Sequence, residues 1–134
     1  MGFMEQLGEI VGEQNLRQEL VERLCYSRDM SVHEGIPEAV VFATTTEQVS
    51  KILKLANEAG MPVIPRGSGT SVTGAILPCR DRGILLDLSR MNRILEINRK
   101  DGYARVAPGV ICNKLNQALA PTHFFPPDPA SAPL

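Results

Sequence analysis

The stretch that decides the fold runs from Pro65 to Pro78 and reads PRGSGTSVTGAILP. It follows the apolar run MPVI and contains three glycines, four hydroxyl side chains and one strongly basic residue, Arg66. Glycine adopts positive φ without steric cost, and successive backbone N–H groups in such turns form a concave site for an anion. This loop therefore predicts a phosphate site built mainly from backbone N–H groups.

Two widespread phosphate-binding motifs do not fit this loop. Gly69 and Gly74 have the spacing of the P-loop, but Ala75 stands where that motif needs lysine. Gly67 and Gly69 begin a Rossmann fingerprint, but Val72 replaces its third glycine. The next strand-like run follows too soon for a full helix to open at the loop. On local chemistry alone, a tight turn of small residues without a ligand explains the stretch equally well.

The sequence around the loop alternates between strand-like and helix-like patterns. The apolar, β-branched run at 39–44 predicts a buried strand, and the runs at 62–67 and 83–89 predict two more. Residues 46–58 carry apolar side chains at helical spacing, after a capping box and before a glycine C-cap. A strand, a helix and a strand with so long a crossover predict parallel pairing of the first two strands.

The segments that flank this unit differ from it. At the N-terminus, 4–12 and 15–25 read as two short helices, the second with Asn15 as its N-cap. After residue 92 the pattern becomes antiparallel. RILEINRKDGYARVAPG predicts a hairpin with a type I′ turn at Asp101-Gly102, and 110–120 predicts a helix. We therefore expect an α+β fold.

Composition narrows the functional classes. The chain has 134 residues, 43% of them hydrophobic and 22% charged, with a net charge of −1, which gives no electrostatic argument for nucleic acid or an anionic membrane. No apolar run is long enough for a transmembrane helix, and the N-terminus lacks the pattern of a signal peptide. With an odd number of cysteines we expect a cytoplasmic protein with reduced thiols. The two histidines are far apart, so no metal site is predicted.

Four motifs, in order, resemble one family. The glycine loop is preceded by YSRDMSVHEGIPEAVVFATTTEQVSKILKLANEAG and followed by RILEINRKDGYARVAPGV and FFPPDPAS. Together, from about Tyr26 to Ser131, they resemble the N-terminal FAD-binding region of flavoproteins with the vanillyl-alcohol-oxidase or PCMH-type fold. Within that group they are most similar to the glycolate oxidase flavin subunit and the D-lactate dehydrogenases. The resemblance implies a partial FAD-binding domain over 1–134, with a parallel β-α-β subdomain to about residue 91 and an incomplete antiparallel subdomain over 92–134.

The resemblance also implies where FAD would bind. The loop would wrap the pyrophosphate through backbone amides, the APG turn at 107–109 would line the groove, and PPDPAS would reach the flavin. The implied FAD-binding residues are Pro65, Arg66, Gly67, Ser68, Gly69, Thr70, Ser71 and Gly74 in the loop, Gly109 in the turn, and Pro127, Asp128 and Ser131 near the end. A simple turn also explains Gly109, and a turn-forming role also explains Asp128.

One loop position refines the cofactor chemistry. Some members of the family attach FAD covalently through a histidine after the glycine pair. In this sequence that position is Thr70, and the loop has no histidine. The resemblance therefore implies FAD bound without a covalent link.

The implied activity is oxidation of a small D-2-hydroxy acid of the glycolate or D-lactate type, with hydride passing to the flavin. The family's substrate domain and a second glycine-rich FAD segment would follow beyond Leu134, so no catalytic residue is assigned. We expect a missing C-terminal portion or other subunits of an oxidase complex as partners. One alternative is a non-catalytic fragment that folds or self-associates as a homo-oligomer without binding FAD productively. A general nucleotide-binding module is a further alternative, weakened by the two failed motifs.

Overall fold

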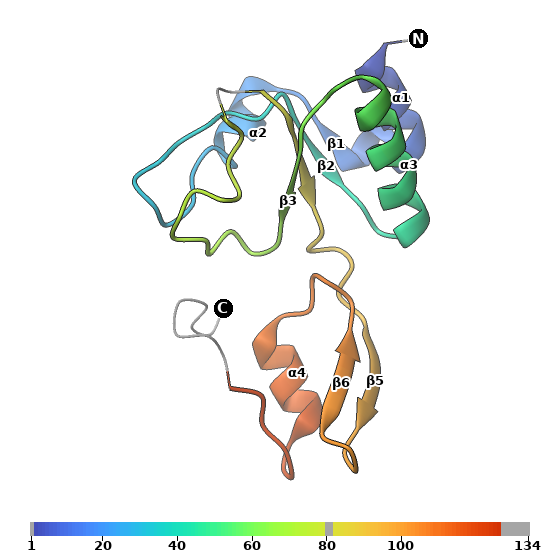
Figure 1. Cartoon of the computed structure of the whole chain (residues 1–134), viewed down its shortest axis with the longest axis vertical. Coiled ribbons are helices and arrows are strands. Elements are labelled where there is room, and N and C mark those ends of the chain that lie inside the picture. The colour runs from blue at the N-terminus through green and yellow to red at the C-terminus, as the bar shows by residue number, and fades with distance from the viewer. Residues whose placement is uncertain (1, 80–81, 127–134) are drawn as a thin grey trace.

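A computed structural model describes residues 2–79 and 82–126, and its elements form two units connected by the segment after β4 (Figure 1). The first unit contains a mixed sheet with helices, and the second contains a hairpin and one helix. The elements are α1 Phe3–Val11, a 3-10 turn Glu13–Asn15, β1 Leu16–Arg17, α2 Leu20–Leu24, β2 Ala39–Phe42, α3 Thr46–Glu58, β3 Val63–Arg66, β4 Ile84–Asp87, β5 Ile94–Asn98, β6 Tyr103–Val106 and α4 Cys112–Leu119.

The sheet of the first unit has the strand order β1-β2-β4-β3. Both β2 and β3 run parallel to β4, which lies between them, so the predicted direct pairing of the strands at 39–44 and 62–67 is wrong. Every residue of β4 is buried, as suits a central parallel strand. Pro65 in β3 has no N–H for a second neighbour, which suits the edge position.

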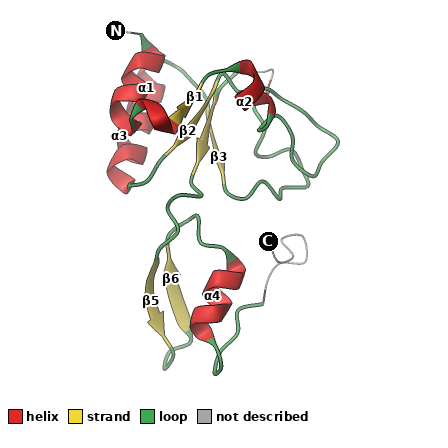
Figure 2. Ribbon diagram, turned by 180° about the vertical axis from the view of Figure 1, so that it is seen from behind, coloured by secondary structure: helices red, strands yellow, loops and turns green. Residues whose placement is uncertain are grey.

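The two faces of this sheet are covered differently. Helices α1 and α3 pack side by side on one face (Figure 2), over a core that includes Leu7, Ile52 and Ile84. The other face carries a smaller cluster of Val40, Phe42 and Leu85, against which Tyr26 packs. The glycine loop lies on this second side, away from the two helices.

Helix α3 begins and ends at the predicted residues. The Thr45 hydroxyl accepts a hydrogen bond from the Gln48 N–H at 3.2 Å, as a capping box requires. The Gln48 side chain, however, accepts from the N–H of Thr44 at 2.8 Å, one residue before the position expected for the box. Gly60 has φ +60°, the left-handed conformation predicted after the helix.

The predicted helix at 15–25 is wrong. Asn15 ends a 3-10 turn and donates to the carbonyl of Val11 at 2.7 Å, so it is no N-cap. Leu16 is buried and pairs with Val41 in an antiparallel strand, and only the five residues of α2 are helical. The leucine spacing misled because the Leu20 and Leu24 side chains are about half exposed and form no buried face.

The hairpin of the second unit is confirmed, but its turn is not of type I′. Asn98 pairs with Tyr103, which leaves a four-residue connection, Arg99–Gly102, instead of a two-residue turn at Asp101-Gly102. The Asn98 side chain closes the loop, since it accepts from the Asp101 N–H at 2.9 Å and donates to the Asp101 carboxylate at 2.8 Å. Gly102 adopts a left-handed conformation in this loop, with φ +73°.

Two further observations concern function. Within residues 2–79 and 82–126, no helix has the length and apolarity needed to cross a membrane. In the same residues, His, Cys, Asp and Glu side chains form no group of three or more that could hold a metal ion.

Candidate functional site

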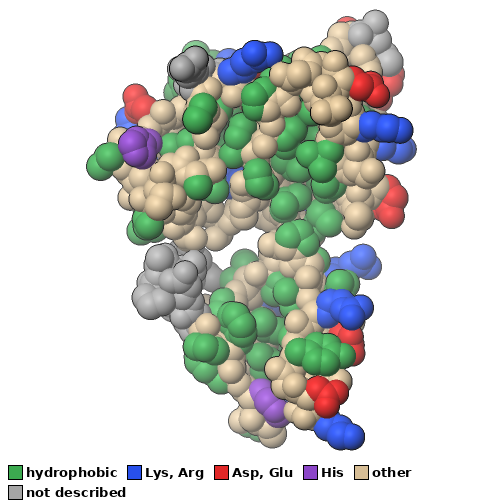
Figure 3. Space-filling model, in the orientation of Figure 1, with side chains coloured by type: hydrophobic (Ala, Val, Ile, Leu, Met, Phe, Trp, Pro, Cys, Tyr) green, Lys and Arg blue, Asp and Glu red, His purple; other side chains and the backbone are tan. Residues whose placement is uncertain are grey.

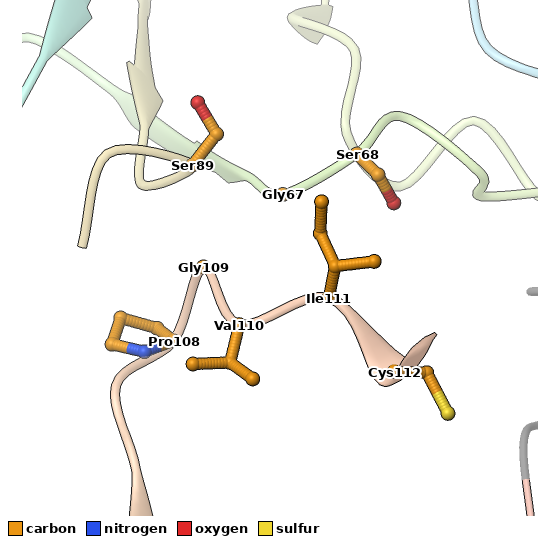
Figure 4. A pocket seen from close by; sticks show the side chains of 8 residues that line it. All are labelled: Gly67, Ser68, Ser89, Pro108, Gly109, Val110, Ile111 and Cys112. Atoms are coloured by element: carbon orange, nitrogen blue, oxygen red, sulfur yellow. The ribbon is translucent and has the colours of Figure 1, made fainter. Parts of the chain in front are cut away.

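A cavity of about 310 Å³ lies where the two units meet (Figure 4). The first unit contributes the start of the glycine loop and the residue two places after β4. The second unit contributes the turn after β6 and the beginning of α4. The lining residues are Gly67, Ser68, Ser89, Pro108, Gly109, Val110, Ile111 and Cys112.

The three loop glycines occupy different backbone conformations. Gly69 and Gly74 have φ +82° and +75°, the left-handed region that the sequence predicts for this loop. Gly67 does not adopt positive φ, which differs from the expectation. A Cβ added at Gly67 would meet nothing within 4 Å, so its missing side chain leaves open space at the cavity.

The loop presents unpaired donors. In the part of the chain that the structure describes, the backbone N–H groups of residues 67–71 donate no hydrogen bond to another chain atom. Unpaired backbone donors need a partner, from water or a ligand. A run of such donors beside left-handed glycines matches the geometry of a backbone anion site.

The segment at residues 29–31 makes hydrogen bonds to the glycine loop. The N–H of Met30 donates to the carbonyl of Ser71 at 2.9 Å, and the Asp29 carboxylate accepts from the N–H of Gly74 at 3.0 Å. The other Asp29 oxygen accepts from the N–H of Ser31 at 2.8 Å. Hydrogen bonds, chiefly from the Ser31 side chain, hold the pKa of Asp29 below its usual value. Sequence reasoning missed Asp29, although DMS has the Asp-x-Ser pattern of an Asx turn.

Arg66 supports the loop from the same side. Its guanidinium lies 5.4 Å from the centre of the Tyr26 ring and donates to the carbonyl of Arg28 at 3.3 Å. It also lies against Gly69, where an added Cβ would come within 2.3 Å of it. The Arg66 side chain thus bridges the loop to the segment that begins at Tyr26.

A buried carboxylate shapes the chain after β4. Asp87 is 4% exposed and accepts from both the N–H and the hydroxyl of Ser89, at 2.8 and 2.5 Å. These bonds fix the turn that brings Ser89 to the cavity. No sequence pattern distinguishes Asp87 from an ordinary residue at the end of a strand.

Gly109 allows the two units to approach closely. An added Cβ would lie 2.2 Å from the carbonyl oxygen of Leu88 and 2.8 Å from that of Ser89, and the N–H of Gly109 donates to the Met91 carbonyl at 2.9 Å. The close approach expected at this turn exists, and its partner in the structure is the chain itself. A role toward FAD stays a prediction.

The third predicted segment is only partly visible. Pro127, Asp128 and Ser131 lie outside the described residues. Just before them, the Asn116 side chain accepts from the N–H of Phe125 at 2.7 Å and donates to its carbonyl at 2.9 Å. This two-way bond fixes the backbone that leads into the segment.

Comparison with known proteins now identifies the fold. The profile of the FAD binding domain family matches residues 37–134. This chain belongs to that family. FAD is therefore its cofactor, and the glycine loop lies inside the matched region.

The relatives that the chain matches in sequence include oxidoreductases of 2-hydroxy acids. The chain is 37% identical to the glycolate oxidase subunit GlcD of Bacillus subtilis over 129 residues, which is 95% of this chain and 27% of the relative. It is 43% identical to D-2-hydroxyglutarate dehydrogenase of Escherichia coli over 112 residues, 80% of this chain and 11% of the relative. The chain thus spans only about a tenth to a quarter of the length of these relatives.

Solved structures confirm the PCMH-type fold. p-Cresol methylhydroxylase superposes with a TM-score of 0.78 and 30% identity, over 87% of this chain and 24% of that one. The 4-ethylphenol oxidase of Gulosibacter chungangensis gives 0.79 and 32%, over 87% and 23%. The predicted mixed architecture, a parallel sheet followed by a separate antiparallel one, is therefore confirmed.

Proposed function

We propose that this chain supplies the diphosphate-binding part of the FAD site in an oxidoreductase that acts on a small D-2-hydroxy acid. The observation that carries the proposal is the glycine loop, which has unpaired N–H groups at 67–71 and lines the cavity between the units with Gly67 and Ser68. Glycolate, D-lactate and D-2-hydroxyglutarate, the substrates in the names of the relatives, share a hydroxyl on the carbon next to a carboxylate.

The loop fits a diphosphate for two reasons. Its unpaired backbone donors match an anion that carries several acceptor oxygens. The open space beside Gly67 leaves room for a ligand to approach the backbone, which a side chain would restrict. We assign Pro65, Arg66, Gly67, Ser68, Gly69, Thr70, Ser71 and Gly74 to this binding surface, with Gly109 opposite and Pro127, Asp128 and Ser131 toward the flavin.

The roles of the cofactor and the chain are distinct. Bound FAD would supply the redox chemistry, as the hydride acceptor. The residues of this chain bind the cofactor, orient it, and close one side of the cavity against water. The pocket for the hydroxy acid would come from the remainder of a longer polypeptide or from a partner subunit.

The binding role is tested by Gly67→Ala. The new methyl group meets no chain atom, so the fold stays intact, but it occupies the path of the ligand, and we expect at least a tenfold rise in the FAD dissociation constant. Flavin fluorescence during titration measures it. Lys100→Ala is the control, because Lys100 is an exposed residue in the connection between β5 and β6 and does not line the cavity. Undiminished affinity in Gly67→Ala would contradict the proposed site.

The mode of attachment is tested separately. Because Thr70 stands where covalent members have histidine, acid precipitation of the FAD-loaded protein should leave all the flavin in the supernatant. Yellow colour that stays with the precipitated chain would show a covalent link.

The substrate class is tested on the whole oxidoreductase that carries this sequence. Glycolate, D-lactate or D-2-hydroxyglutarate should bleach the bound flavin under anaerobic conditions, and L-lactate should not. Bleaching by L-lactate alone would exclude the D-2-hydroxy acid class and leave the FAD-binding role untouched.

One observation favours the second candidate, a fragment that self-associates without productive FAD binding. Large apolar side chains reach the surface of the second unit (Figure 3), and Ile111, Phe124 and Phe125 are 51%, 69% and 52% exposed. Exposed apolar patches favour association. A chain that sediments as an oligomer and gives no stabilisation by FAD would support this candidate instead.

A further inference from the structure

We infer that Asp29 is a positioning residue for FAD, which holds the glycine loop in its anion-binding conformation without touching the cofactor. The inference deepens the proposed function and rests on it. Asp29 lies outside the loop and does not line the cavity between the units.

Three contacts attach the segment 28–30 to the loop. Asp29 accepts from the N–H of Gly74, Met30 donates to the carbonyl of Ser71, and the carbonyl of Arg28 accepts from the Arg66 side chain. They are spread along the loop from its first residues to its last glycine. The two segments run side by side on the same side of the sheet in both ribbon views (Figures 1 and 2).

The hydrogen bonds between the segment 28–30 and the loop leave the loop N–H groups at 67–71 available for a ligand. The segment 28–30 uses the carbonyl of Ser71 and the N–H of Gly74, and it leaves the N–H groups of 67–71 free. Gly74 is one of the two left-handed glycines of the loop. Because glycine has wide backbone freedom, the hydrogen bond that its N–H donates to Asp29 restricts the loop where the backbone could otherwise change conformation.

The hydrogen bonds to the charged Asp29 carboxylate distinguish a positioning role from a role in packing alone. A carboxylate close to a diphosphate site is disfavoured by the like charge, whereas hydrogen bonds to its oxygens stabilise its charged form. Both oxygens of Asp29 accept backbone N–H bonds, and the Ser31 and Ser71 hydroxyls add to them. Hydrogen bonds led by that of Ser31 hold the pKa of Asp29 below its usual value, because these donors favour the ionised carboxylate.

The inference is tested with three variants in an FAD titration. Asp29→Ala removes both acceptors and should raise the FAD dissociation constant at least tenfold. Asp29→Asn keeps one acceptor oxygen and should recover part of that loss. Asp101→Ala, which removes an aspartate from the hairpin loop of the other unit, should bind FAD like the original chain.

Amide hydrogen exchange without FAD gives a readout that general destabilisation does not reproduce. Asp29→Ala should raise exchange of the Gly74 N–H, the loop amide that donates to Asp29, at least tenfold and leave β2 and β4 unchanged. Faster exchange throughout the sheet, or FAD affinity in Asp29→Ala equal to that of the original chain, would overturn the inference. Equal weakness of the Asn and Ala variants would also overturn it, because charge and not hydrogen bonding would then control binding.

The two levels of failure differ. If the original chain binds no FAD, the proposed function fails, and the exchange of the loop still decides whether Asp29 holds it. If the original chain binds FAD and Asp29→Ala binds it equally well, only the role of Asp29 is wrong.

Discussion

At the scale of single residues, glycines that look alike in the sequence serve different purposes. Gly69 provides a left-handed backbone, Gly67 leaves open space, and Gly109 allows two backbones to touch. The glycine-rich loop predicted roles for Gly67 and Gly69, because glycine suits a tight anion-binding turn, and the family resemblance implied a role for Gly109. The sequence could not separate the three reasons, because φ and neighbouring atoms depend on the folded chain.

We expect Gly69→Val to abolish FAD binding. A β-branched residue at φ +82° is a genuine conformational outlier, so the loop would rearrange. The Arg66 side chain beside it is flexible at its tip and would give way, which leaves backbone strain as the main effect. FAD titration checks the loss, and hydrogen exchange over 46–58 should stay unchanged, since α3 lies on the other face of the sheet. Equal FAD affinity in the variant would refute the backbone argument.

Gly109→Ala tests the contact between the units. Its Cβ would collide with the backbone of Leu88 and Ser89, which cannot move aside as a flexible side chain does. We expect a loss of about 1–3 kcal/mol in the free energy of unfolding, as for overpacked sites. Urea denaturation measures the change, with Gly67→Ala as the control that adds the same methyl group in open space. Stability equal to that control would show that the collision is relieved at no cost.

Tyr26 gives the chain a pH dependence at the alkaline end. Burial, and next the charge of Asp87, raises the pKa of Tyr26 above its usual value of 10.0. The unfolded chain therefore loses this proton first, so the stabilising contribution is complete below about pH 10 and is lost as the pH rises through the higher pKa of the folded state. Melting temperatures between pH 9 and 11 should fall more steeply for the original chain than for Tyr26→Phe. Parallel curves would contradict the assignment.

At the scale of elements, the sequence predicted correctly those helices and strands whose bounds depend on neighbouring residues in the chain. The helix at 46–58 carries its own cap and apolar face, so its bounds were right to the residue. The predicted helix at 15–25 failed because pairing of Leu16 with β2 is a long-range contact. The place of β4 between β2 and β3 likewise depends on burial across the sheet, which no single segment reveals.

Helix α4 holds the backbone of Phe125 through one side chain, Asn116. Asn116→Ala removes both hydrogen bonds to Phe125, and at about 1 kcal/mol for each bond we expect this backbone to loosen by about 2 kcal/mol. Hydrogen exchange at the Phe125 N–H measures this, because that amide loses its acceptor. Asn113→Ala, an exposed position on the same helix, is the matched control. Protection at the Phe125 N–H that is as strong in Asn116→Ala as in Asn113→Ala would contradict the prediction.

At the scale of the whole molecule, the site is shared between the units. The sequence predicted the loop, the turn at 107–109 and the later segment as separate motifs, and the structure brings the first two to one cavity. Asp29 and Asp87 could not be predicted, because their roles depend on the folded chain and, for Asp29, on a partner 45 positions away. Sequence motifs thus identify residues that line a site more readily than residues that position the site through hydrogen bonds.

FAD should couple the two units. The closest packing between the described elements lies within one unit or the other. The segment after β4 links the units, because Met91 packs against the core of the first unit and its carbonyl accepts from the Gly109 N–H at 2.9 Å. A ligand at 100 times its dissociation constant stabilises the folded state by about 2.7 kcal/mol. If FAD contacts both walls of the cavity, hydrogen exchange should slow in β2 and in β6 alike, while riboflavin, which lacks phosphate, should slow neither. Slowing confined to β2 would mean that the cofactor binds the glycine loop without engaging the turn at 107–109.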